Sequence, residues 1–134
     1  SVQGRMTDAK KKKAIELRAM DVAREHYEGQ GYEVIDTSSN CPYDFECFKG
    51  NEIRRVEVKG TTTSGDAVYV TSNEVDDALS NECETDLFIV HHINVLVNGP
   101  GEYAAFDGEV KHIKNWKPEV ENLQAKMYQY HLPD

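Results

Sequence analysis

Hydrophobic and polar positions along the first half of the chain predict one helix followed by several short strands. Apolar residues recur at helical spacing between residues 7 and 28 and form a stripe along one side of the helix. Gly29 and Gly31 mark its end, because glycine tolerates the left-handed conformation that often follows a helix. The shorter apolar segments that follow predict strands at residues 32–37, 43–48, 53–60 and 67–70.

The second half of the chain predicts a helix, a hairpin and a last helix. Thr71 and Glu74 have the spacing of a capping box, so we expect a helix at residues 72–81 and assign Glu74 to its cap rather than to catalysis. Residues 86–97 predict a long strand that turns and returns at residues 102–107. Residues 118–130 predict a final amphipathic helix with a proline in its first turn. The whole succession indicates an α/β (α+β) fold.

The length of 134 residues leaves room for one domain, which we expect to span residues 1–134 as part of a larger protein. Residues 1–6 are expected to be a linker or an artificial remnant. No apolar run is long enough to cross a membrane, so we expect no membrane partner. The three cysteines lack the CxxC spacing of a zinc site and are an odd number, which favours a reducing compartment and a cytoplasmic location.

The charge balance limits the ways in which this protein could contact nucleic acid. The formal net charge is −9, whereas tight nucleic-acid binding depends on Lys and Arg that neutralise phosphates. Lysines at residues 10–13 form either a solvated helix end or a phosphate-facing patch. Acidic residues between positions 74 and 86 predict a surface that repels DNA. Contact with nucleic acid must therefore be local, assisted by a metal ion, or shared with another domain.

Candidate chemistry is concentrated at Glu57-Val58-Lys59, near the end of a predicted strand. Because side chains alternate along a strand, Glu57 and Lys59 are expected on one face and Val58 on the other. Asp44 lies on the preceding predicted strand and could approach Glu57. Two carboxylates on neighbouring strands suit Mg²⁺, which also keeps several waters and accepts phosphate oxygens. A lysine beside such an ion could orient or deprotonate water, or hold a phosphate.

Glu16 falls on the apolar side of the first predicted helix. At about 100° per residue it lies near Met20, Ala23 and Tyr27 in projection, so we expect it to face the core. A carboxylate in that position costs several kcal/mol unless it is paired, protonated or bound to metal. The alternative is a partly exposed glutamate at the helix edge, bonded to an arginine or to the backbone.

His91 and His92 lie side by side in the long predicted strand and are expected on its opposite faces. The surrounding sequence has neither HxH nor HExxH spacing and no nearby cysteine pair. We therefore interpret the two histidines as packing or surface residues rather than as metal ligands.

These motifs resemble the PD-(D/E)XK nuclease superfamily, in which an Asp on one strand is followed by Glu-X-Lys on the next. The residues here are Pro42-Tyr43-Asp44 and Glu57-Val58-Lys59, with Tyr43 inserted relative to the simplest form of the motif. Together with Thr71-Ser72-Asn73-Glu74, they look most similar to the C-terminal domain of NO VEIN proteins, a relative of the Mrr-like branch. The resemblance covers about residues 12–90.

The resemblance implies a restriction-endonuclease-like fold, with a central mixed β-sheet flanked by helices. It implies DNA hydrolysis that depends on Mg²⁺ or Mn²⁺, in a restriction or defence system. Asp44 and Glu57 would bind the ion, the Val58 carbonyl would be an extra ligand, Lys59 would position or activate water, and Glu16 would complete the metal shell. A fused or separate recognition or helicase domain would choose the site, and two copies could pair as a homodimer to cut both strands.

Two alternatives remain open at this point. The first is a catalytically silent domain of the same fold that serves as a nucleic-acid or protein interaction module, which the acidic charge balance favours. The second is a plain α/β scaffold in which Glu57-Val58-Lys59 occurs by chance.

Overall fold

The computed structural model describes the backbone of residues 2–134 and the side chains from residue 8 onward. The elements, in chain order, are α1 (Val2–Gly29), β1 (Glu33–Asp36), β2 (Phe45–Lys49), β3 (Glu52–Gly60), α2 (Ser72–Leu79), β4 (Glu84–His91), β5 (Asn94–Gly99), β6 (Glu102–Phe106), β7 (Glu109–Ile113) and a short 3-10 helix, η1 (Val120–Asn122).

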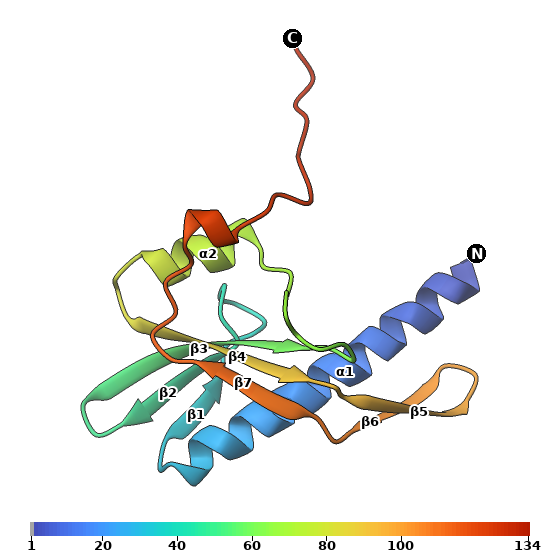
Figure 1. Cartoon of the computed structure of the whole chain (residues 1–134), viewed down its shortest axis with the longest axis horizontal. Helices are drawn as coiled ribbons and strands as arrows, with labels where there is room; N and C mark the ends of the chain where they lie inside the picture. Colours follow the sequence, from blue (N-terminus) through green and yellow to red (C-terminus); the bar gives the residue numbers. More distant parts are fainter. Residues whose placement is uncertain (1) are drawn as a thin grey trace.

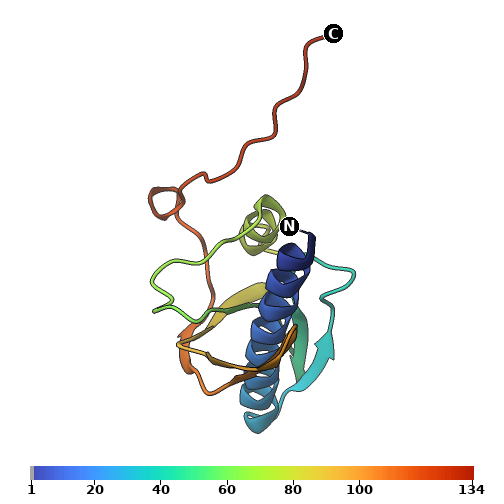
Figure 2. The same ribbon diagram turned by 90° about the vertical axis from the view of Figure 1, so that its right-hand side faces the viewer.

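Five strands form one mixed sheet in the order β1-β2-β3-β4-β7, and β5 and β6 form a separate hairpin (Figure 1). Only the central pair, β3 and β4, is parallel; the remaining neighbours in the sheet are antiparallel. Parallel neighbours need a crossover connection, which here contains α2. Figure 2, turned by 90°, shows α1 running along the sheet with the β5–β6 hairpin beside it.

The core lies between α1 and one face of the sheet. Ala19, Ala23 and Tyr27 recur every four residues along α1 and are buried. Alternate residues of β3 and β4 point toward them, among them Val56, Val58, Phe88 and Val90. Small alanines let the helix approach closely, and Gly60 at the end of β3 leaves no room for a Cβ, which would stand 2.8 Å from the Cβ of Ala19.

The conformation of Gly31 explains why α1 ends where it does. Gly31 has a φ of 92°, in the left-handed region that glycine tolerates. The N–H of Gly31 donates to Glu28 O, and the N–H of Tyr32 donates to Tyr27 O, which together form a Schellman motif. This turn directs the chain into β1.

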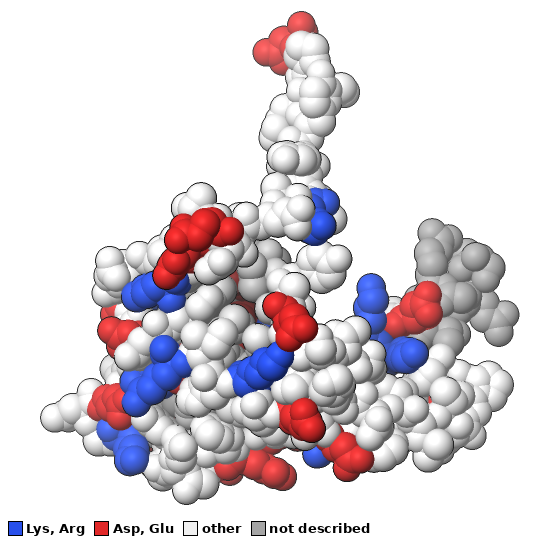
Figure 3. All heavy atoms as spheres, in the orientation of Figure 1, with Lys and Arg blue, Asp and Glu red and all other residues white. Residues whose placement is uncertain are grey.

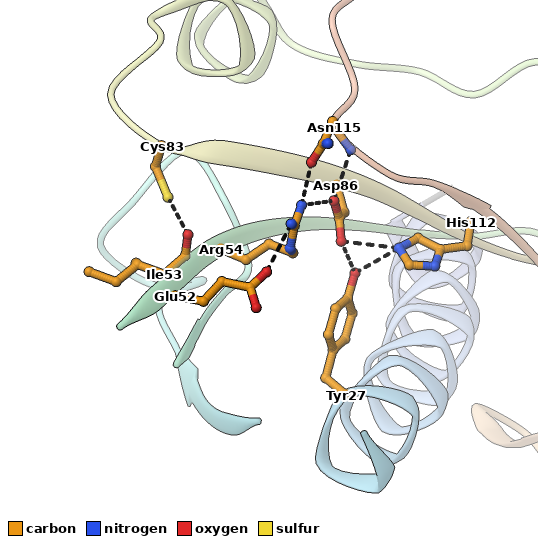
Figure 4. Close-up of polar contacts among 8 residues, drawn as sticks. All are labelled: Tyr27, Glu52, Ile53, Arg54, Cys83, Asp86, His112 and Asn115. Carbon is orange, nitrogen blue, oxygen red and sulfur yellow. Dashed lines mark hydrogen bonds and ion pairs between the residues drawn. The ribbon is translucent and has the colours of Figure 1, made fainter. Parts of the chain in front are cut away.

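A buried polar network lies between the C-terminal end of α1 and the sheet (Figure 4). The Tyr27 hydroxyl donates to Asp86 Oδ2 at 2.6 Å, and His112 Nε2 is 3.0 Å from the same oxygen. Arg54 Nη1 donates to Asp86 Oδ1 at 2.8 Å, and the N–H of Asn115 donates to that oxygen at 3.0 Å. The network therefore joins α1, β3, β4 and the chain around β7 through one carboxylate.

The opposite face of the sheet meets α2. Arg55 Nη1 donates to Asp77 Oδ1 at 2.6 Å, and Lys59 Nζ donates to Glu74 Oε1 at 3.0 Å. Because Arg55 and Lys59 alternate with the core residues of β3, the two helices cover opposite faces. The predicted mixed sheet flanked by helices is therefore confirmed, and the architecture is consistent with an α/β nuclease-like fold. In the described part of the chain, no helix combines the length and the apolar character that spanning a membrane requires.

Two predicted strands differ from those observed. Residues 67–70 form no strand and belong to the irregular connection between β3 and α2. The long strand predicted at residues 86–97 is two strands in two sheets. The chain breaks at His92, whose φ of 53° is incompatible with an extended strand.

The predicted helix at residues 118–130 is also wrong, since only η1 forms there. Met127 is 90% exposed, and residues 124–134 are exposed throughout. A short helix needs tertiary packing of its apolar side to be stable, and this segment extends away from the body (Figure 1). By contrast, β7 was not foreseen, because its sequence lacks a clear alternation of apolar and polar residues.

Candidate functional site

A cavity of about 420 Å³ opens where β3 ends. It is bounded by the middle of α1, the start of β2, the end of β3 and the first turn of α2. The lining residues are Lys12, Ile15, Glu16, Asp44, Glu57, Val58, Lys59, Gly60, Thr61, Thr62 and Glu74. All four predicted site side chains, Glu16, Asp44, Glu57 and Lys59, are therefore among those that line it.

Asp44 lies immediately before β2, and two backbone hydrogen bonds fix its position. Its N–H donates to Val56 O at 2.9 Å, and its carbonyl accepts the N–H of Thr37 at 2.8 Å. Its carboxylate is directed toward β3, where Oδ2 accepts the N–H of Val58 at 2.8 Å. Burial raises the pKa of Asp44, although the Val58 N–H and the nearby Lys59 oppose this change.

Glu57 is 3% exposed and points to the α2 side of the sheet. Burial, together with the charges of Asp44 and Glu74, raises the pKa of Glu57 to about 10 despite the opposing effect of Lys59. Two neighbouring buried carboxylates cannot both ionise cheaply without a compensating cation. With a pKa of about 10, Glu57 keeps its proton at neutral pH unless a further cation enters the cavity.

Lys59 lies between two carboxylates. Its Nζ is 3.0 Å from Glu74 Oε1 and 3.5 Å from Glu57 Oε1. Burial alone would lower the pKa of Lys59, but the charges of Glu57 and Glu74 outweigh it and raise the pKa. The ammonium group is therefore charged at neutral pH and held in place within the cavity.

Glu74 is a cavity residue that sequence reasoning assigned only to a helix cap. The predicted capping box is present: Thr71 Oγ1 accepts the N–H of Glu74, and Glu74 Oε1 accepts the N–H of Thr71. Burial opposes ionisation of Glu74, but the Thr71 N–H and Lys59 outweigh it and lower its pKa. The spacing of Thr71 and Glu74 identified the cap, but nothing local indicated that the cap would face Lys59.

Glu16 does not face the core as expected. Its side chain is 56% exposed and lies 3.7 Å from Lys13 Nζ, so the helix-edge alternative describes it better. The fully buried line of α1 begins at Ala19, with the partly buried Ile15 packed one turn before it, and Glu16 lies beside this line at the exposed edge of the cavity. Val58 contributes backbone to the cavity lining, while its side chain lies in the core.

The donor set of Asp44 and Glu57 fits Mg²⁺, which is commonly bound through one or two carboxylates and keeps several waters. A third acid does not complete the set. Among the described residues, Glu16, Asp44 and Glu57 do not form a trio with ligand atoms within 4.8 Å of one another. Any ion in this cavity would therefore be bound by two carboxylates, with water or substrate oxygens at its other positions.

The charge around the cavity is mixed. Lys12 brings one lysine of the cluster at residues 10–13 to the cavity lining. On the face shown in Figure 3, Lys and Arg are interspersed with Asp and Glu and form no continuous basic surface. A second hollow beside α2 is lined by several acids, including Asp76, Asp77 and Glu82. The acidic surface predicted around α2 is thus present, and a polyanion would have to approach from the α1 side of the cavity.

Comparison with known families gives one match. A family model described as "Protein NO VEIN, C-terminal" matches residues 15–99, a range that contains Glu16, Asp44, Glu57, Lys59 and Glu74. No curated protein and no solved structure was found to match the chain. Because the matched range covers more than half of the chain, the protein belongs to the family of NO VEIN C-terminal domains.

Proposed function

We propose that this domain is a metal-dependent endonuclease of the PD-(D/E)XK type that hydrolyses phosphodiester bonds in DNA. The observation that supports it is the joint placement of Asp44, Glu57 and Lys59 in one cavity. Burial raises the pKa of both acids, and the charge of Asp44 further opposes the ionisation of Glu57. A divalent cation is the natural compensation for such a pair.

Each side chain has a role that follows from its position. Asp44 and Glu57 would hold Mg²⁺ or Mn²⁺, with the Val58 carbonyl as a further ligand; when bound, the ion would supply Lewis-acid catalysis and offset phosphate charge. Lys59, charged and held between two carboxylates, would orient water or bind a phosphate oxygen. Glu16, at the exposed edge of the cavity, would orient a water molecule.

A catalytically silent interaction module is the second candidate, and one contact favours it. The ammonium group of Lys59 already pairs with Glu74 at 3.0 Å, so a substrate phosphate must compete with that carboxylate. The net charge of −9 also opposes independent DNA binding. If the domain is an active nuclease, a fused or separate recognition or helicase domain would supply the affinity for DNA that it lacks. The predicted biological setting is still a restriction or defence system.

Cleavage of supercoiled plasmid DNA in Mg²⁺ or Mn²⁺ tests the proposal. We expect the wild-type chain, alone or joined to its native neighbour, to nick or cut the plasmid, and EDTA to abolish this activity. Asp44→Ala and Lys59→Ala should each reduce the rate by at least about 100-fold, because each removes a group that acts on the reacting phosphate or water.

Matched controls separate this effect from general loss of charge or fold. Asp21→Ala and Lys49→Ala change exposed residues of the same types and should cut at the wild-type rate. Circular dichroism must show that all variants are folded. Equal cleavage by wild type, Asp44→Ala and Lys59→Ala would reveal a contaminating nuclease and refute the assignment.

Calorimetric titration with Mn²⁺ distinguishes the two candidate functions. If the cavity is an active site, the wild type should show a heat of Mn²⁺ binding, and Asp44→Asn should lose most of that heat. A silent module should show the same trace for both proteins and no cleavage even when its native neighbour is present.

A further inference from the structure

A second group of potential metal ligands lies where β4 ends. His91, His92 and Glu109 each offer one ligand atom, and these atoms all lie within 4.8 Å of one another. His91 Nδ1 is 3.8 Å from Glu109 Oε2. No other trio of His, Cys, Asp or Glu in the described part of the chain meets this distance.

The fold brings the three residues together from two strands and a turn. His91 and Glu109 are direct partners in the antiparallel pairing of β4 with β7. His92 has a φ of 53°, and its N–H donates to Thr63 O at 2.9 Å, so it leaves the strand and does not continue the alternation. The expectation that the two histidines face opposite sides is therefore wrong, and their ring centroids are 4.9 Å apart.

The burial of His91 gives independent support for a ligand. Its side chain is only 9% exposed, and its Nδ1 is buried with no hydrogen-bond partner in the described structure. The 3.8 Å to Glu109 is too long for a hydrogen bond. A buried ring nitrogen without a partner costs free energy, and a bound cation shared with Glu109 would remove that cost.

We propose that His91, His92 and Glu109 bind a zinc ion. Two imidazoles and one carboxylate are a known zinc ligand set that leaves a fourth position for water. Two ligand atoms at about 2.0–2.2 Å from a tetrahedral ion lie roughly 3.4 Å apart. The 3.8 Å between His91 Nδ1 and Glu109 Oε2 is close to that value, and the ligand atom of His92 lies within 4.8 Å of the other two, so side-chain rotation would complete the site. Imidazole nitrogen also favours zinc over Mg²⁺, which prefers oxygen ligands.

This site is separate from the cavity of Asp44 and Glu57 and does not depend on the proposed nuclease function. None of its three residues lines that cavity. Glu109 also lies outside the range matched by the family model. A bound ion would fasten the end of β4 to β7, next to the loop held by the contact between His92 and Thr63.

Titration of the tag-free chain with Zn²⁺, in competition with a chromophoric chelator, tests the proposal. We expect one high-affinity equivalent per chain. His92→Ala and Glu109→Gln should each weaken binding by at least about tenfold, since loss of a direct ligand should cost no less than loss of an outer partner. Both side chains are exposed, so neither substitution should unfold the protein.

Three further measurements exclude other binding sites. His131→Ala, in the exposed C-terminal segment, should bind Zn²⁺ as the wild type does. Asp44→Asn should also bind normally, and a Co²⁺-loaded sample should lack the near-ultraviolet band of thiolate ligation. Absence of a high-affinity equivalent, a loss confined to Asp44→Asn, or a thiolate band would overturn the zinc site.

Discussion

Two buried acids, Glu57 and Asp86, lie in opposite electrostatic environments. Burial tends to raise the pKa of each carboxyl, but in Asp86 the Tyr27 hydroxyl, the Asn115 N–H, His112 and Arg54 outweigh it and lower the pKa. Glu57 meets another acid instead, and its pKa rises to about 10. A hydrogen-bonded carboxylate of the first kind serves structure, whereas a buried acid of the second kind, with a strongly raised pKa, is characteristic of functional sites.

At the residue scale, we predict that Tyr27→Phe, which removes one hydrogen bond to Asp86, destabilises the protein. The change removes the 2.6 Å hydrogen bond to Asp86 while keeping the ring in the core, and should cost about 1–3 kcal/mol of unfolding free energy. Urea denaturation at neutral pH measures this loss. Tyr69→Phe is the matched control, because Tyr69 is 79% exposed and should change stability by less than about 0.5 kcal/mol. Equal effects of the two substitutions would mean that the bond contributes nothing.

At the scale of elements, the position of the cavity depends on how closely α1 crosses the end of β3. Gly60 permits that approach, because a Cβ there would stand 2.8 Å from Ala19 Cβ and 3.0 Å from Ile15 O. Ile15 and Gly60 both line the cavity, so the same contact that packs the helix brings Glu16 to the cavity that contains Lys59. Packing and site geometry are thus set by a single contact between elements.

We accordingly predict that Gly60→Ala forces α1 and β3 apart and costs about 1–3 kcal/mol of stability, as overpacking of a core does. Chemical denaturation measures the cost. Gly29→Ala provides the comparison, since no atom lies within 4 Å of a Cβ at the last residue of α1. That variant should be neutral or slightly stabilising, because alanine favours helix. If Gly60→Ala proves equally neutral, the helix has more room than the structure shows.

At the scale of the whole molecule, two helices cover opposite faces of the five-stranded sheet, and the C-terminal segment lies outside these layers (Figure 1). The last strong anchors before that segment are the N–H of Trp116, which donates to Thr85 O at 2.6 Å, and Lys117 Nζ, which donates to Ala78 O at 2.9 Å. Residues 124–134 are exposed along their whole length. They bury too little apolar surface to contribute to stability.

A chain that ends at Leu123 should therefore unfold with the same free energy as the full chain, within about 0.5 kcal/mol. Thermal and urea denaturation of the two lengths, compared side by side, measure the difference. A loss of more than about 1 kcal/mol would show that the segment packs on the body, as the predicted helix at residues 118–130 would have done.

The sequence by itself determined the features that depend on local pattern. The spacing of Ala19, Ala23 and Tyr27 predicted the buried side of α1, and alternation along β3 placed Glu57 and Lys59 on one face, as observed. Thr71 and Glu74 predicted the start of α2. These signals are reliable because each depends only on the spacing of residues within a single helix or strand.

Other features were decided only by the tertiary structure. The contact of Glu74 with Lys59 depends on where the crossover places α2, and the approach of Glu109 to His91 depends on the pairing of β4 with β7. Glu16 lies at the exposed edge of the cavity and not in the core, which the helical projection of α1 could not show. Contacts between residues far apart in sequence depend on how all the helices and strands pack together. The periodicity of a single helix or strand contains no information about that packing.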